Sequence, residues 1–195
     1  MKKIERRILS SALEVRAEGE STQIVGHAAL FNRDSELIAG SFIERIAPGA
    51  FTESLSKPDD VRALINHDPN LILGRNLSKT LTLREDDQGL HVTIDPPKTS
   101  YAQDLIESTK RGDISQMSFG FQTITDSWTR GENGAPDVRT LIKVRLFDVS
   151  PVTFPAYPDT DVAVRSHDAF VNTVPIESDD TEIRRRRNEL EAMTC

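Results

Sequence analysis

Residues 116–121 read Gln-Met-Ser-Phe-Gly-Phe, a short apolar run with Ser118 inside it and Gly120 two positions further on. Such runs are typical of β-strands. A serine within a strand needs a hydrogen-bond partner or a cavity for its hydroxyl, and the glycine leaves room for another segment to approach closely. Ser118 is therefore either a small structural residue or a nucleophile, and Ser115 and Ser150 are rival nucleophiles on composition alone.

A histidine lies upstream, at the point where another apolar run ends. Residues 61–66 read Val-Arg-Ala-Leu-Ile-Asn, and His67-Asp68-Pro69-Asn70 follows as a strong turn signal. Loops at strand ends present side chains to clefts, and a neutral imidazole can take a proton from a hydroxyl near neutral pH. The alternative for His67 is an ordinary histidine of a surface turn. Serine and histidine are two of the three groups of a nucleophilic hydrolase.

Two residues compete for the third position of such a triad. Asp148 ends the strand-like run 141–147, and its carboxylate would orient His67 if that run lies beside the strand that carries Ser118. His91 lies in an alternating run and points away from its apolar neighbours. The G-x-S-x-G turn of the α/β-hydrolases does not occur around Ser118, because its first glycine is absent. Spacing alone leaves Asp148 and His91 both open.

The remaining pattern predicts a mainly β fold with some helix, of the α+β class and mostly antiparallel. Residues 48–56 and 101–111 are expected to be helices, and Gly112 is placed to end the second one. Prolines and charged residues become frequent after residue 150, which predicts a domain over 1–165 and a charged tail or linker over 166–195. The expected strands cover 21–31, 42–46, 61–66, 71–75, 80–84, 90–95, 117–124 and 138–149.

The composition limits the classes of function. The 195 residues carry a formal net charge of -7, with 28% charged and 37% hydrophobic residues, so a core is feasible and general nucleic-acid binding is not expected. With Cys195 as the single cysteine an intramolecular disulfide is excluded, and no apolar run is long enough to span a bilayer. The histidines lack metal-ligand spacing and the glycines a phosphate-binding pattern, so no metal or other cofactor is expected. We expect a soluble, intracellular protein.

Several of these segments, taken in order, resemble the tailed-phage prohead (capsid maturation) serine proteases, a family similar to the herpesvirus assemblins. The resemblance covers roughly residues 10–165. Any one segment alone would be weak, whereas their order and combination are specific. The matching segments are 24–28, 42–51, 66–68 with 73–75, 112–121 and 146–157.

The resemblance implies an antiparallel, barrel-like protease core surrounded by a few helices. It implies a serine endopeptidase whose histidine falls on His67 and whose nucleophile falls on Ser118. The third member falls on Asp148, where the family often has a glutamate. The herpesvirus relatives use a second histidine instead, which keeps His91 as the alternative. The implied reaction is acyl transfer from a peptide to Ser118, followed by hydrolysis.

The resemblance also implies partners and a place of action. The expected substrates are the scaffold protein or the major capsid protein precursor, and the enzyme itself, inside the immature phage capsid (prohead) in the host cytoplasm. No membrane and no direct nucleic-acid partner are expected, and a homodimer is an expectation because the herpesvirus relatives dimerise. Two other interpretations stay open: a non-enzymatic capsid-assembly or scaffold component on the same fold, and a product of a prophage remnant taken over by its bacterial host.

Overall fold

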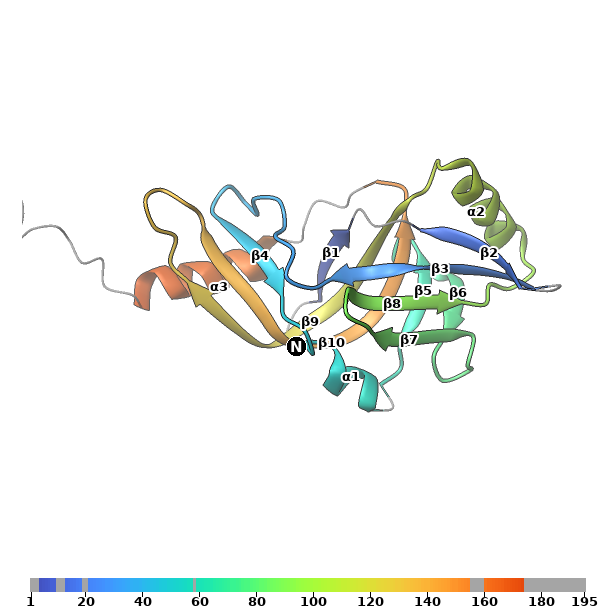
Figure 1. Ribbon diagram of the computed structural model, residues 1–195, viewed down its shortest axis with the longest axis horizontal. Coiled ribbons are helices and arrows are strands. Elements are labelled where there is room, and N and C mark those ends of the chain that lie inside the picture. Colours follow the sequence, from blue (N-terminus) through green and yellow to red (C-terminus); the bar gives the residue numbers. More distant parts are fainter. Residues whose placement is uncertain (1–3, 10–12, 19–20, 58, 155–159, 174–195) are drawn as a thin grey trace, which may run out of the picture.

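Two β-sheets and three helices make up the described part of the chain (Figure 1). The computed structural model describes residues 4–9, 13–18, 21–57, 59–154 and 160–173. The larger sheet contains β1 (Glu5–Leu9), β9 (Gln116–Thr129), β10 (Asp137–Val152), β5 (Arg62–Ile65) and β6 (Asp68–Arg75), with β4 (Phe42–Ile46) also paired to β10. The smaller sheet contains β2 (Glu14–Glu18), β3 (Ser21–Leu30), β8 (Gly89–Ile94) and β7 (Leu81–Glu85). The helices are α1 (Thr52–Ser56), α2 (Ser100–Arg111) and α3 (Thr160–Thr173).

The hairpin of β9 and β10 is the central feature of the larger sheet. The two strands pair antiparallel along most of their length, and β1 pairs antiparallel with the other edge of β9. The second edge of β10 has two parallel neighbours, β4 beside residues 137–141 and β5 beside residues 148 and 149. The hairpin therefore runs from the end of the elongated fold that carries α3 toward the end that carries α2, as Figure 1 shows.

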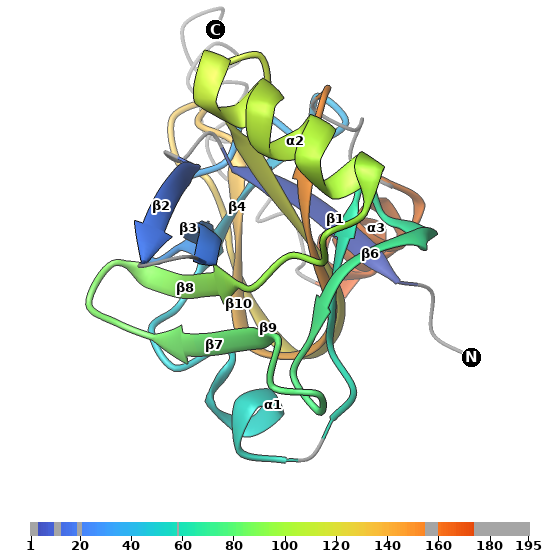
Figure 2. The ribbon, with the colours of Figure 1, turned by 90° about the vertical axis from the view of Figure 1, so that its right-hand side faces the viewer.

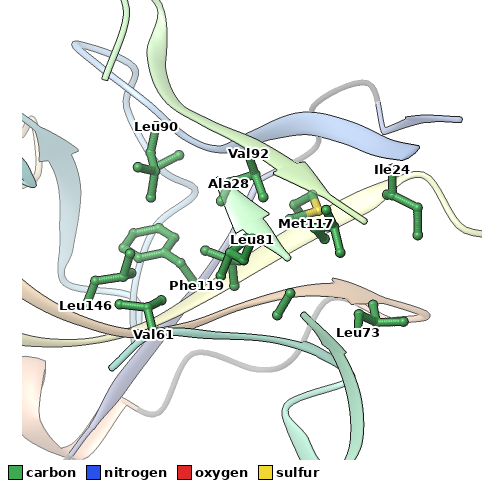
Figure 3. Close-up of a cluster of buried hydrophobic side chains, with 14 of the residues drawn as sticks. Ile24, Ala28, Val61, Leu73, Leu81, Leu90, Val92, Met117, Phe119 and Leu146 are labelled. Atoms are coloured by element: carbon green, nitrogen blue, oxygen red, sulfur yellow. The ribbon is translucent and has the colours of Figure 1, made fainter. Parts of the chain in front are cut away.

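The main hydrophobic core contains residues from both sheets (Figure 3). Strand β9 contributes its alternate residues Met117, Phe119 and Phe121, and β8 contributes Leu90 and Val92. Figure 2 shows α2 across one end of the strands, where its residues Ala102, Leu105 and Ile106 are buried. Because strand side chains alternate between faces, Ser118 and Gly120 are directed to the face of β9 opposite the core residues.

A β-bulge changes which residues of β10 face the core. Leu146 pairs with Phe121 and Asp148 pairs with Gly120, so that Phe147 is an extra residue in β10. Before the bulge Val144 and Leu146 enter the core, and after it the core residue is Val149. A bulge inserts one residue and so reverses the alternation of the strand. The bulge therefore turns Asp148 to the same face as Ser118.

A network of buried charges connects β1 to the rest of the larger sheet. The Arg139 guanidinium donates to Glu5 at 2.8 Å, to Glu44 at 3.0 Å and to Asp126 at 2.7 Å. Arg7 donates to Glu44 at 2.7 Å. Burial alone would raise the pKa of Glu5, but hydrogen bonds from Arg139 and Thr123 and the positive charges nearby outweigh it and lower that pKa below its ordinary value. Glu5 is therefore held ionised inside the protein.

A second, smaller cluster holds α3 against the far end of the hairpin. Trp128 of β9 stacks on Phe170 of α3 with ring centroids 5.4 Å apart, and Phe42 of β4 lies 4.9 Å from Trp128. Ala163 is fully buried there, and His167 contacts Asp137 at 2.9 Å. Residues 163, 167 and 170 recur at helical spacing, which explains why this segment is a helix.

The α+β class with a sheet-dominated core is confirmed, and the two sheets are not closed into a barrel. The eight expected strands correspond to β3–β10, with β9 and β10 longer than predicted. Both expected helices are present, although the first covers only Thr52–Ser56. The sequence after residue 165 was interpreted as a linker, so it did not predict the second half of α3. The proposed domain boundary at 165 falls within this helix, and the charged tail after residue 173 lies outside the described residues.

Candidate active site

His67 lies in a tight turn between β5 and β6. Ile65 pairs with Asp68, which leaves Asn66 and His67 as a two-residue connection. Both have positive φ, 52° and 58°, as the type I′ hairpin turn requires. The backbone N–H of Asn66 donates to the carbonyl oxygen of Pro151 at 3.0 Å. The side-chain oxygen of Asn66 accepts from the backbone N–H of Thr153 at 2.9 Å. The turn is thereby attached to the end of β10, beside the strand that carries Ser118.

Ser118 lies on β9 between Ile8 of β1 and Ser150 of β10, its partners in the two neighbouring strands. It faces away from the main core, yet its exposed fraction is 0%. A hydroxyl without access to solvent requires a partner within the protein. His67 provides that partner: its Nε2 is 2.7 Å from Ser118 Oγ.

The other nitrogen of the same imidazole contacts Asp148. His67 Nδ1 is 2.5 Å from Asp148 Oδ1. An ionised carboxylate can only accept hydrogen bonds, so a neutral imidazole must carry its proton on Nδ1 and leave Nε2 free to accept the proton of Ser118. The row Ser118, His67, Asp148 has the geometry in which a histidine acts as general base toward a serine.

Gly120 makes room for the Asp148 carboxylate. The two residues are paired across β9 and β10. A Cβ atom at position 120 would lie 2.1 Å from Asp148 Oδ2 and 3.1 Å from its carboxyl carbon, so that any side chain there would displace the carboxylate. The glycine two residues after Ser118 therefore has a specific reason, namely the space that the carboxylate occupies.

The alternative candidates lie elsewhere in the fold or make other contacts. His91 belongs to β8 of the smaller sheet, where its ring meets that of His27 at 5.2 Å in an edge-on arrangement. Burial, with the positive charge of Arg84 second, lowers the pKa of His91. Ser115 is exposed in the segment before β9. Of the candidates, Asp148 and Ser118 are therefore the residues that contact the imidazole of His67.

The row has little exposure to solvent. Ser118 is fully buried, and only 5% of the His67 side chain is exposed. Within the described residues, no group of three His, Cys, Asp or Glu side chains is arranged to hold a metal ion, and no helix has the length and apolar character to cross a bilayer.

Comparison with known proteins places the chain in a family. The sequence profile described as "Caudovirus prohead serine protease" matches residues 11–173, a range that includes His67, Ser118 and Asp148. The chain belongs to this family. It is a serine protease of the kind that acts in the maturation of tailed-phage capsids. No curated protein sequence matches the chain.

A solved structure agrees with the fold of this prohead protease. The capsid assembly protease of bacteriophage T4, gp21, superimposes with a TM-score of 0.52 at 11% sequence identity. The superposition covers 78% of this chain and 98% of the T4 chain. At this identity the similarity concerns the fold. It shows that the described sheets are arranged as in a protease that acts in capsid assembly.

Proposed function

We propose that this prohead protease is a serine endopeptidase that cleaves scaffold or capsid-precursor segments, and itself, during the maturation of a phage prohead. The observation that supports this most directly is the hydrogen-bonded row of Ser118, His67 and Asp148, in which both imidazole nitrogens are engaged. The enzyme acts inside the immature capsid in the host cytoplasm. Its partners are the scaffold protein or the major capsid protein precursor.

The first half of the reaction forms an acyl-enzyme. Ser118 Oγ attacks the carbonyl carbon of the scissile peptide while its proton passes to His67 Nε2. Asp148 accepts the Nδ1–H bond throughout and stabilises the imidazolium without taking the proton itself. When the tetrahedral intermediate collapses, the C–N bond breaks and Nε2 returns the proton to the departing amine.

The second half releases the product. A water molecule gives a proton to His67 Nε2 as its oxygen attacks the acyl carbon. The bond to Ser118 Oγ then breaks, the proton returns to Oγ, and the carboxylic product leaves.

The proposal is tested by incubating the protein with the major capsid precursor and identifying the fragments by mass spectrometry. Wild type is compared with Ser118→Ala and with Ser115→Ala, a control in which the exposed rival serine is removed. We expect fragments with wild type and Ser115→Ala and none above background with Ser118→Ala. Fragments that persist unchanged with Ser118→Ala would show that Ser118 is not the nucleophile.

A further inference from the structure

Ser150 has a contact that the reaction described above does not use. It follows Asp148 by two positions on β10 and is fully buried. Its hydroxyl donates to Asp148 Oδ1 at 2.9 Å, and the same oxygen accepts the Nδ1–H of His67 at 2.5 Å. Since residues two apart on a strand share a face, the backbone of β10 itself directs the Ser150 hydroxyl to the carboxylate.

The carboxylate would be poorly oriented without this contact. The terminal torsion of an aspartate is broad, so a single hydrogen bond to His67 leaves the carboxyl plane free to rotate. Ser150 adds a second donor to Oδ1 from its own strand, and Gly120 bounds the other oxygen, because Oδ2 fills the space where a side chain would be. The two hydrogen-bond donors to Oδ1 and the close packing of Oδ2 against Gly120 together define the direction of the carboxylate.

We propose that Ser150 is a positioning residue of the triad, whose hydroxyl holds the Asp148 carboxylate so that Oδ1 faces His67 Nδ1. The catalytic consequence rests on the proposed function, whereas the orientation of the histidine does not. The contact also explains why a second serine lies opposite Ser118. Ser150 is engaged by the carboxylate, and the imidazole nitrogen that accepts a proton faces Ser118.

The test uses a matched pair of variants. Ser150→Thr keeps the hydroxyl, and Ser150→Val has nearly the same shape without it. Ser150→Ala serves as the smaller variant if the added methyl group is not tolerated in this buried position. Thermal unfolding establishes that each compared variant is folded.

The first readout is the proton NMR signal of the His67 Nδ1–H, assigned by its loss in His67→Gln. A proton held between an imidazole and a carboxylate is strongly deshielded and protected from exchange with water. We expect Ser150→Ala and Ser150→Val to move this signal upfield and to accelerate its exchange, and Ser150→Thr to keep it near the wild-type position. Equal signals in all variants would overturn the proposal.

The second readout is the covalent labelling of Ser118 by a fluorophosphonate probe, followed by mass spectrometry over a range of probe concentrations. We expect Ser150→Ala and Ser150→Val to lower the maximal labelling rate about tenfold to a hundredfold, the effect of losing one hydrogen bond to a charged group. The concentration for half-maximal rate should stay unchanged, and Ser150→Thr should restore most of the rate.

The two readouts separate the failure of this inference from that of the proposed function. If wild type is not labelled at Ser118, the proposed nucleophile is wrong, and the NMR signal still decides the role of Ser150. If wild type is labelled but Ser150→Val reacts as fast as Ser150→Thr, the hydroxyl does not position Asp148. A change only in the probe concentration for half-maximal labelling would also contradict the inference, because Ser150 would then affect probe binding.

Discussion

The close pairing of Gly120 and Asp148 leads to a sharp prediction for Gly120→Ala. The new Cβ atom would lie 2.1 Å from Asp148 Oδ2, whereas ordinary contact begins near 3.4 Å. The carboxylate must therefore move by about 1 Å, a displacement that can cost a hundredfold in rate when it affects a reacting group. Complete loss of the carboxylate function would cost about 10⁴-fold. We expect the labelling of Ser118 to slow by a factor between these limits.

The same substitution should reduce stability by a steric route. Gly120 does not have positive φ, so alanine is compatible with the backbone at this position. Overpacking at a buried site costs about 1–3 kcal/mol. Urea unfolding of Gly120→Ala, Asp148→Ala and the double variant isolates the clash, because Gly120→Ala should cost little once the carboxylate is gone. The reasoning is refuted if Gly120→Ala destabilises equally in both backgrounds, or if it leaves the labelling rate unchanged.

Three further predictions concern the triad, the buried charges and α3. Asp148→Asn should slow labelling of Ser118 about 10⁴-fold, because an amide can donate to Nδ1 and so favours the wrong tautomer; retained labelling would remove Asp148 from the triad. Glu5→Gln should lower the free energy of unfolding by about 3 kcal/mol, since Arg139 stays buried with one anionic partner fewer. Because the pKa of Glu5 is lowered from 4.5, wild type has the stability contributed by Glu5 above that pH and loses it as the pH falls through the folded value. Glu5→Gln should decline less steeply in this window, and parallel stability curves would contradict the assignment. Trp128→Ala should accelerate amide hydrogen exchange in α3 while leaving β9 around Ser118 unchanged, and an unchanged α3 would show that the aromatic cluster does not hold it.

The strands of the main core were predictable because apolar residues alternate clearly in them. Strand β1 was not, because its buried positions hold Glu5 and Arg7, and charged residues in sequence indicate a surface. They are buried because Arg139 and Glu44, more than thirty positions away, neutralise them. No local pattern contains that information.

The candidate site divides in the same way. His67 and Ser118 stand out because a histidine at a strand end and a serine within an apolar strand are unusual locally. Asp148 was harder to place, since alternation counted from Leu146 directs it into the core, and the bulge that reverses the count has no signal in the sequence. The role of Ser150 depends on that bulge too. Gly120, opposite Asp148, was the available hint that a bulky group lies nearby.

The bulge at Phe147 also restricts how the hairpin can misfold. Val144 and Leu146 of β10 fill the core before the bulge, and Asp148 lies on the opposite face after it. If β10 slipped by one residue along β9, Asp148 would turn into the apolar core without a partner, and an unpaired buried carboxylate is far more costly than a displaced apolar side chain. The carboxylate that contacts His67 therefore also disfavours the wrong pairing of the strands. A chain in which Asp148 is neutral should tolerate misaligned hairpins that the native chain rejects, and its refolding should be less uniform.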